Sequence, residues 1–230
     1  MFYFSSDERE RKRILRKFKK SGVIIPCCDG VLIDKNTHIG KGTTILSGTV
    51  IKEGCSIGGH CIIGPNTVLY KTSVGNGCII NSVQSEKAVI KDNVTAGPFV
   101  HLRPATVLEK GVHCGNFTEV KNSTVGESTK ISHLTYIGDS DVGSGVNFGC
   151  GVVTVNFNGK EKNRCQIEDD AFIGCNTNLI APVKIGKRAY TAAGSTITKD
   201  VPENALAIAR EKQTNKENWV NIKKPYREKE

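Results

Sequence analysis

The stretch VLIDKNTHIGKGTTILSGTVIKEGCSIGGHCIIGPNTVLY, residues 31–70, carries an aliphatic residue at every sixth position. These positions are Ile33, Ile39, Ile45, Ile51, Ile57, Ile63 and Leu69. The spacing resumes from Ile90 to Val120 and again from Ile167 to Ile197. A period of six fits neither the turn of a helix, about 3.6 residues, nor the two-residue alternation of a long strand. It indicates short strands joined by corners and repeated along most of the chain.

A second ladder, of small side chains, follows the aliphatic residues by four positions. It is made by Thr37, Thr43, Thr49, Cys55, Cys61 and Thr67, and later by Val94, Val100, Thr106, Val112 and Thr118. Three hexapeptide units form one triangular coil, and coils stack through parallel hydrogen bonds about 4.8 Å apart. The aliphatic side chains then point inward and the small ones fit near the corners. The sequence therefore predicts an all-β solenoid, a parallel β-helix of hexapeptide repeats.

The composition agrees with a narrow core and favours anionic partners. The 230 residues are 38% hydrophobic and only 6% aromatic, with 24 glycines. Their formal net charge of +9 favours nucleic acid, a membrane surface or phosphorylated small molecules. No apolar stretch approaches the roughly 20 residues of a membrane span, and the N-terminus does not resemble a signal peptide. We therefore expect a cytoplasmic protein.

The nine cysteines do not suggest a metal centre or a disulfide framework. They are scattered without any CxxC, and several belong to the ladder of small residues. We expect the ladder thiols Cys55 and Cys61 to be inert because of burial, and Cys150 and Cys175 to be the more reactive. His38, His60, His101 and His113 show no three-ligand spacing on adjacent coils. The sequence predicts no metal site.

The two ends and one long interruption leave the repeat. Residues 1–30 are expected to form a basic helix and arm, 31–201 the rod, and 202–230 a C-terminal tail that docks through Trp219. The helix begins with a capping-box spacing at 5–8, and eight of its twelve residues from Arg9 to Lys20 are basic. A nucleic-acid arm is less favoured than a solvated helix that packs by its apolar stripe. The register also slips at 73–88 and breaks at 153–166, where we expect loops on the binding face.

Two sets of residues carry possible chemistry. Arg103 and Lys121 are separated by three hexapeptide units, one coil of the repeat, so their like charges stack unless they splay into solvent. A phosphate between them would relieve this repulsion. His133, in SHLTYIG, is a candidate general base near neutral pH, although a single histidine on a solenoid often has no catalytic role.

Five motifs closely resemble the acetyltransferase domain of the bifunctional GlmU family. They are LRPAT at 102–106, GNFTEVKNST at 115–124, SHLTYIGD at 132–139, VNFGCG at 146–151 and APVKIGKRAYTAAGSTITKDVP at 181–202. The likeness extends from about Arg11 to Trp219. Members of that bacterial family acetylate glucosamine-1-phosphate and then uridylate the product. The resemblance implies a left-handed β-helix, a homotrimer of parallel rods, acetyl-CoA as cosubstrate, and no metal requirement for acetyl transfer.

The resemblance also implies a role for each matching residue. His133 corresponds to the general base and Glu119 to the carboxylate that supports it. The residues implied to bind the sugar phosphate are Arg103, Lys121, Tyr136, Asn147, Asn156 and Lys162. Those implied to contact the acetyl group or coenzyme A are Cys150, Asn156, Phe157, Cys175, Ala193 and Arg210. Among them, the backbone N–H of Cys150 would stabilise the oxyanion.

The sequence departs from the family in two respects. Cys150, Phe157 and Cys175 replace the usual alanine, tyrosine and serine, and each lost hydroxyl removes a hydrogen bond of roughly 0.5–1.5 kcal/mol. We expect weaker cofactor binding rather than lost chemistry. Only the segment 1–30 precedes the first repeat, and the uridyltransferase domain is absent from it. We therefore expect no uridyltransferase activity, and a separate protein to supply it.

These observations predict an acetyl-CoA-dependent glucosamine-1-phosphate N-acetyltransferase of the UDP-GlcNAc and cell-envelope precursor pathway. Two alternatives stay open. One is an acetyltransferase for another amino sugar or sugar nucleotide. The other is a non-catalytic trimeric scaffold or regulatory homologue, for which the joint presence of His133, Glu119, Arg103, Lys121 and Lys162 would be unnecessary.

Overall fold

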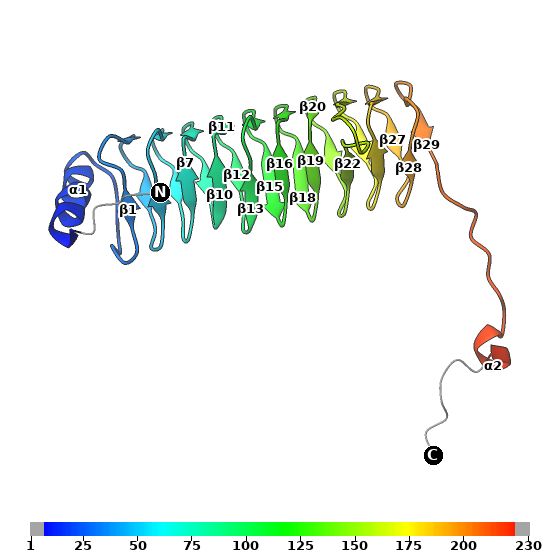
Figure 1. Ribbon diagram of the computed structural model, residues 1–230, viewed down its shortest axis with the longest axis horizontal. Coiled ribbons are helices and arrows are strands. Elements are labelled where there is room, and N and C mark those ends of the chain that lie inside the picture. The colour runs from blue at the N-terminus through cyan, green and yellow to red at the C-terminus, as the bar shows by residue number, and fades with distance from the viewer. Residues whose placement is uncertain (1–6, 224–230) are drawn as a thin grey trace, which may run out of the picture.

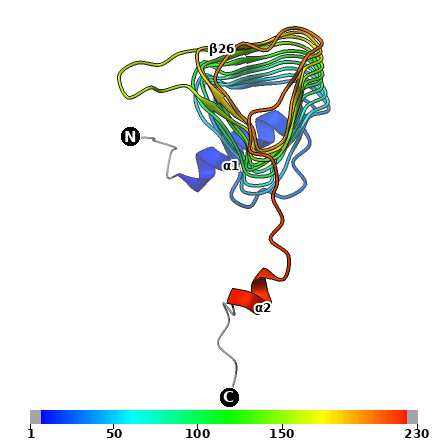
Figure 2. The same cartoon turned by 90° about the vertical axis from the view of Figure 1, so that its right-hand side faces the viewer.

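Three parallel β-sheets wrap the repeats into a triangular rod, seen from the side in Figure 1 and along its axis in Figure 2. The computed structural model describes residues 7–223. Strands run from Leu32 to Ala207, with helix α1 (Glu8–Lys20) at one end and a tail that carries the short helix α2 (Trp219–Lys223) at the other.

Each sheet collects every third strand, because three strands complete one coil. Sheet 1 contains β1 (Leu32–Ile33), β4 (Val50–Ile51), β7 (Val68–Tyr70), β10 (Val83–Glu86), β13 (Val100–Leu102), β16 (Glu119–Lys121), β19 (Tyr136–Gly138), β22 (Val153–Val155), β25 (Asn178–Ile180) and β28 (Thr196–Ile197). Sheet 2 contains β2 (His38–Ile39), β5 (Ser56–Ile57), β8 (Ser73–Val74), β11 (Val89–Ile90), β14 (Val107–Leu108), β17 (Thr124–Val125), β20 (Ser140–Val142), β23 (Cys165–Ile167) and β26 (Val183–Ile185). Sheet 3 contains β3 (Thr44–Ile45), β6 (Ile62–Ile63), β9 (Ile79–Ile80), β12 (Thr95–Ala96), β15 (His113–Asn116), β18 (Lys130–His133), β21 (Asn147–Phe148), β24 (Phe172–Ile173), β27 (Tyr190–Thr191) and β29 (Leu206–Ala207).

The β-helix is left-handed, as the family resemblance implied. Figure 2 looks from the C-terminal end of the rod, with β26 of sheet 2 at the top and the long β22–β23 loop at the upper left. The chain therefore passes clockwise from sheet 1 to sheet 2 to sheet 3 while it advances toward the viewer. A clockwise path toward the viewer defines a left-handed coil.

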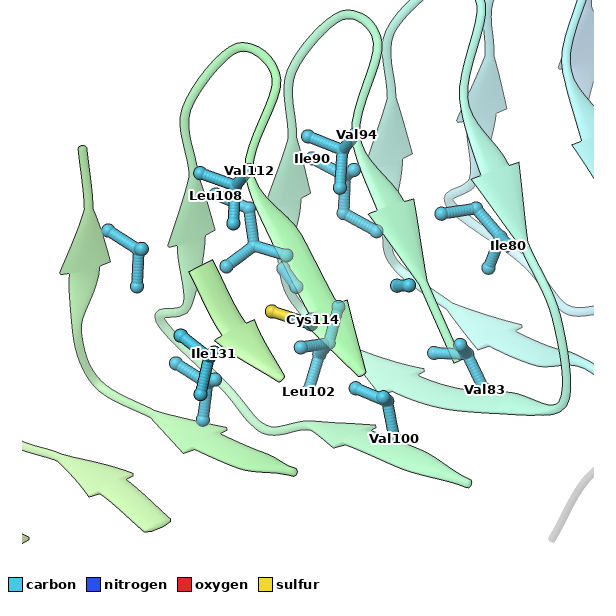
Figure 3. Close-up of a cluster of buried hydrophobic side chains, with 14 of the residues drawn as sticks. Ile80, Val83, Ile90, Val94, Val100, Leu102, Leu108, Val112, Cys114 and Ile131 are labelled. Atoms are coloured by element: carbon cyan, nitrogen blue, oxygen red, sulfur yellow. The ribbon is translucent and has the colours of Figure 1, made fainter. Parts of the chain in front are cut away.

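The aliphatic ladder forms the core as predicted. Ile45, Ile51, Ile63 and Leu69 have no exposed surface, and Figure 3 shows the same inward packing in later coils, at Ile80, Leu102 and Ile131 among others. The small-residue ladder also binds the corners together. The Thr43 hydroxyl donates to the carbonyl of Gly58 at 2.7 Å and accepts from the backbone N–H of Cys61 at 3.1 Å.

The coil length varies along the rod. Leu32 stands over Val50 and His101 stands over Glu119. Each pair is separated by the three full hexapeptides expected for one coil. Glu119, however, stands over Tyr136, so that coil is one residue short. The slip at 73–88 is absorbed by a still shorter coil, in which Val68 stands over Gln84. Our expectation of a loop there is wrong, because neighbouring strands keep their pairing. The break at 153–166 does form a loop, and it protrudes from the rod in Figure 2.

Helix α1 closes the first coil. Leu15 and Phe18 are buried against the core, and the Arg11 guanidinium donates to the carbonyls of Val31, at 3.0 Å, and Cys28. Asp7 caps the helix by accepting from the N–H of Arg9. Residues 5 and 6 of the predicted capping box lie outside the described residues. The helix thus shields core side chains that have no preceding coil to cover them.

The tail leaves the rod after β29 and extends away from it (Figure 1). Its helix α2 exposes Trp219, Val220 and Ile222, and within residues 7–223 none of the three is buried. The predicted docking of Trp219 stays a prediction, since the described part of the chain offers it no cover.

The end-closing role of α1 can be measured. Phe18→Ala removes a buried ring, and we expect it to lower the free energy of unfolding by about 3–5 kcal/mol. Chemical denaturation followed by circular dichroism measures the loss. Lys19→Ala, an exposed change on the same helix, serves as control. Equal stability of the two variants would contradict the account.

Candidate functional site

Polar residues gather along the two long edges of sheet 1. Where sheet 3 turns into sheet 1, Asn116 stands over His133, and the same register carries His133 over Cys150. The column continues to Cys175 and Ala193, since the backbone N–H of Asn176 donates to the Cys150 carbonyl at 2.7 Å and that of Gly194 to the Cys175 carbonyl at 2.8 Å. We call this column, with Arg210 at its end near Gly194, the histidine edge.

The imidazole of His133 is exposed and held in one orientation. Its Nδ1 lies 2.7 Å from the side-chain oxygen of Asn116. An amide oxygen only accepts, so Nδ1 carries the proton and donates it. The neutral ring therefore has its lone pair on Nε2, available to take a proton. Asn116 was not singled out in the sequence. Counting back one shortened coil from His133 would have found it.

Glu119 pairs with Arg103 in this structure. Its Oε1 lies 2.9 Å from Nη1 of Arg103, and its partner on the next coil is Tyr136. Both side chains are partly exposed, so this pair contributes at most about 1 kcal/mol to stability. The supporting contact from Glu119 to His133 stays a prediction, and the described contact of His133 is with Asn116.

Along the opposite edge, where sheet 1 turns into sheet 2, two ammonium groups lie together. The close contact with Lys162, helped by partial burial, lowers the pKa of Lys121 below its ordinary value. Lys162 comes from the β22–β23 loop, where it pairs with Phe157 across a short antiparallel bridge. We call this set, together with Asn122, Asp139 and Asn156, the lysine edge. Its adjacent ammonium groups are suited to binding an anion.

A buried carboxylate lies beneath these lysines. Asp139 is 4% exposed and accepts hydrogen bonds from the side-chain amides of Asn122 and Asn156. Burial opposes its charge, but the two amides and then Lys121 and Lys162 outweigh burial and lower the pKa of Asp139. Sequence reasoning missed this residue. The signal was the even spacing of 122, 139 and 156, which repeats the shortened coil.

The other predicted residues divide between the edges and a third face. Tyr136 lies on sheet 1 with its hydroxyl 3.5 Å from the amide nitrogen of Asn156. Phe157, expected at the cofactor, is 55% exposed on the loop of the lysine edge. Asn147 belongs to sheet 3, paired with Lys130 and Phe172, and so lies on a different face from the sheet 1 residues.

One chain does not bring the two edges together. Asp139 follows His133 by one hexapeptide length, which crosses one side of the triangle, up to about 20 Å of extended backbone. The histidine edge holds the candidate base and four predicted cofactor residues. The lysine edge holds the anion-binding groups and Asn156. Each edge is therefore half of the expected site.

The buried thiols differ from one another. Burial raises the pKa of Cys55, and raises those of Cys114 and Cys165 to about 12. Cys61 and Cys78 are hydrogen-bonded to each other, which lowers the pKa of Cys61 and raises that of Cys78, and both thiols are buried. Across residues 7–223 no three His, Cys, Asp or Glu side chains gather closely enough to hold a metal ion.

Comparison with known proteins identifies similar sequences. The family described as bacterial transferase hexapeptide (six repeats) matches residues 30–71 and 164–199. The bifunctional protein GlmU of Caldicellulosiruptor saccharolyticus is 52% identical over 217 residues, 94% of this chain and 47% of that protein. The GlmU of a Geobacillus species is also 52% identical, over 92% of this chain and 46% of its own. The resemblance inferred from the five motifs is confirmed, and the chain spans about half the length of the curated relatives it matches.

The solved structures add little to this comparison. A UDP-N-acetylglucosamine acyltransferase from Arabidopsis is 15% identical, with a TM-score of 0.43, 82% of this chain and 70% of that chain covered. That likeness is too weak to bear on function. Between residues 7 and 223, no helix combines the length and apolarity required to cross a membrane.

The lysine edge should bind inorganic phosphate. We expect Lys121→Gln and Lys162→Gln each to weaken that binding roughly 10-fold or more, since each loses a charged hydrogen-bond donor. Lys160→Gln, on the same loop, is the matched control. Isothermal titration calorimetry measures all four proteins. Unaltered affinity in both lysine-edge variants would rule out the anion site.

The same site should depend on pH. Lys121 must be protonated to attract an anion, and Lys162 lowers its pKa. Above about pH 8, where phosphate is already a dianion, affinity should therefore fall before the ordinary lysine range is reached. Lys162→Gln removes the neighbouring charge and should move that fall to higher pH. A pH profile identical in the two proteins would contradict the assignment.

Proposed function

Because this chain is similar over more than nine-tenths of its length to about half of each bifunctional GlmU protein, we propose that it is an N-acetyltransferase. It uses acetyl-CoA to acetylate the amine of glucosamine-1-phosphate, giving N-acetylglucosamine-1-phosphate. The observation that carries the proposal is a paired-lysine anion site at one edge of sheet 1 together with, at the other edge where β18 of sheet 3 ends, an imidazole whose Nε2 is free.

The proposed chemistry is a direct transfer with His133 as general base. Nε2 takes a proton from the sugar amine as the amine attacks the thioester carbonyl. The carbonyl oxygen becomes an oxyanion, which the backbone N–H of Cys150 stabilises one coil further along the histidine edge. The C–S bond then breaks, the amide forms, and coenzyme A leaves as the thiol after receiving the proton. Asn116 keeps Nδ1 protonated throughout.

The phosphate end of the substrate binds at the lysine edge. Lys121 and Lys162 supply two ammonium groups, and Arg103 lies one coil from Lys121 on sheet 1. An anion there removes the repulsion that lowers the pKa of Lys121. A phosphorylated acceptor is therefore favoured over an uncharged amino sugar, because Asp139 balances only part of this positive charge.

We further propose that the active protein is a homotrimer in which the histidine edge of one rod meets the lysine edge of the next. The half-sites described above give one reason. A second is the apolar column beside His133: Phe99, Phe117 and Leu134 are 62, 54 and 57% exposed, with the two rings stacked 5.4 Å apart. Each stands at positive φ, a conformation that large apolar residues rarely adopt and that aims them outward. A neighbouring rod would cover them.

Cys150, Cys175, Ala193 and Arg210 continue from His133 in order along the histidine edge, which we propose as the path of coenzyme A. The Cys175 thiol and the Phe157 ring do not reproduce the hydroxyl contacts that the resemblance implies for serine and tyrosine. The acetyl-CoA affinity is the property that these substitutions would alter.

Removal of the base tests the mechanism. His133→Ala should lower kcat for acetylation of glucosamine-1-phosphate about 10²–10⁴-fold and leave the melting temperature unchanged. Release of free thiol measures the rate, and His38→Ala, an exposed histidine near the far end, is the control. Near-normal kcat in His133→Ala would place the base elsewhere. An inactive wild-type protein would favour the scaffold alternative.

The assembly is tested by sedimentation velocity. We expect a particle about three times the 24.9 kDa of one chain. Phe117→Asp places a charge in the apolar column and should shift the population toward single chains, whereas Lys130→Asp on the neighbouring face of sheet 3 should not. A wild-type protein that sediments as one chain would refute the shared site.

A further inference from the structure

The lysine edge contains one buried acid that the proposed mechanism does not use. Asp139 is the only charged residue among the buried polar residues of the described chain. Each carboxylate oxygen has a named donor: Asn122 donates to Oδ1 and Asn156 to Oδ2. A charge this deeply buried persists only where it is hydrogen-bonded on both sides. The role of the Asp139 charge is therefore to be sought in its effect on Asn122 and Asn156.

The backbone places the three side chains in one column. Asn122 and Asp139 both occupy the corner at positive φ, 45° and 46°, a conformation that Asn and Asp tolerate. Stacked coils repeat the corner at 122, 139 and 156, so each side chain faces the next one along the rod. The contact between Asp139 and Asn156 is thus a direct result of coil stacking.

This contact determines which way the Asn156 amide points. A carboxylate only accepts, so the NH₂ group of Asn156 must face Asp139. The same nitrogen lies 3.5 Å from the hydroxyl of Tyr136. With its donors directed to these two groups, Asn156 presents its oxygen in the remaining direction. An oxygen there accepts a hydrogen bond from an amine or an ammonium.

We propose that Asp139 is a positioning residue that fixes the Asn156 amide with its oxygen toward the acceptor amine. Its effect on catalysis rests on the proposed function. The role of the negative charge is to set the orientation of one amide. It does not bind phosphate, because its charge repels an anion at Lys121 and Lys162.

Asp139→Asn tests the proposal without changing shape or backbone preference. The new amide has one accepting oxygen, so it can accept from only one of Asn122 and Asn156, and the other must turn its own oxygen toward the new NH₂ group. Asn156 is then no longer held in one orientation and can present NH₂ to the amine. We expect kcat to fall roughly 10–100-fold, while the affinity for inorganic phosphate stays equal or rises because a nearby negative charge is gone. Asp170→Asn, an exposed aspartate also at positive φ, is the matched control.

A purely structural role gives a different pattern. A loosened corner would displace Lys121 and Lys162, so phosphate affinity would fall together with kcat, and this outcome overturns the proposal. Wild-type kcat in Asp139→Asn overturns it as well. The double variant Asp139→Asn with Asn156→Asp restores an oxygen toward the acceptor, and its kcat should exceed that of the single variant.

A readout without turnover separates this proposal from the function itself. In protein labelled with ¹⁵N at asparagine, the Asn156 side-chain amide should exchange slowly with solvent in the wild type and faster in Asp139→Asn. Its signal is assigned by its loss in Asn156→Ser. Slow exchange in a protein that fails to acetylate glucosamine-1-phosphate would contradict the proposed function but support the proposed orientation of the Asn156 amide by Asp139. Equal exchange rates in the wild type and in Asp139→Asn would show that Asp139 does not hold the Asn156 amide.

Discussion

The parallel hydrogen bonds between successive coils are the constraint from which the rest of this structure follows. They hold equivalent positions of neighbouring coils about 4.8 Å apart, so any residue type repeated at the coil length becomes a column. Inside the rod this gives the aliphatic columns that exclude water, as at Ile45, Ile63 and Ile80. At the corners it gives columns of polar side chains, in which neighbours either form hydrogen bonds or, when they carry like charges, repel one another.

The candidate functional residues lie where a column places charged groups together, or places a hydrogen-bond donor over an acceptor. Asn116 over His133 orients an imidazole, and Asn122, Asp139 and Asn156 bind one another around a buried charge. Lys162 reaches the end of the column only because a loop interrupts the repeat, and Asp139 balances only part of the positive charge that Lys162 and Lys121 bring together. A regular solenoid has flat faces, so the interruption and the edges supply what a site requires.

The sequence predicted the fold well because its six-residue period corresponds directly to the strands and corners that stack in the rod. The aliphatic positions, the small-residue ladder and the protruding 153–166 loop all follow from spacing alone. Coil length was less predictable. The slip at 73–88 closes within shortened coils, and the loss of a single residue from a coil decides which side chains meet. That shift places Asn116, instead of Gly115, over His133, and it hid Asp139 from the sequence reasoning. Asn147 was matched by motif, and its strand pairs with the His133 strand on sheet 3, so it lies beside the histidine edge and not on sheet 1.

The central claim is that the two edges of sheet 1 are halves of one site completed by a neighbouring chain. Mixed trimers test it directly. His133→Ala and Asn156→Ala are each expected to be inactive in acetylation of glucosamine-1-phosphate when pure, since each damages every site. Denatured together and refolded, or coexpressed, they should regain activity, because some interfaces then combine an intact histidine edge with an intact lysine edge. A mixture as inactive as its two components would show that each site is built within one chain, and would contradict the account.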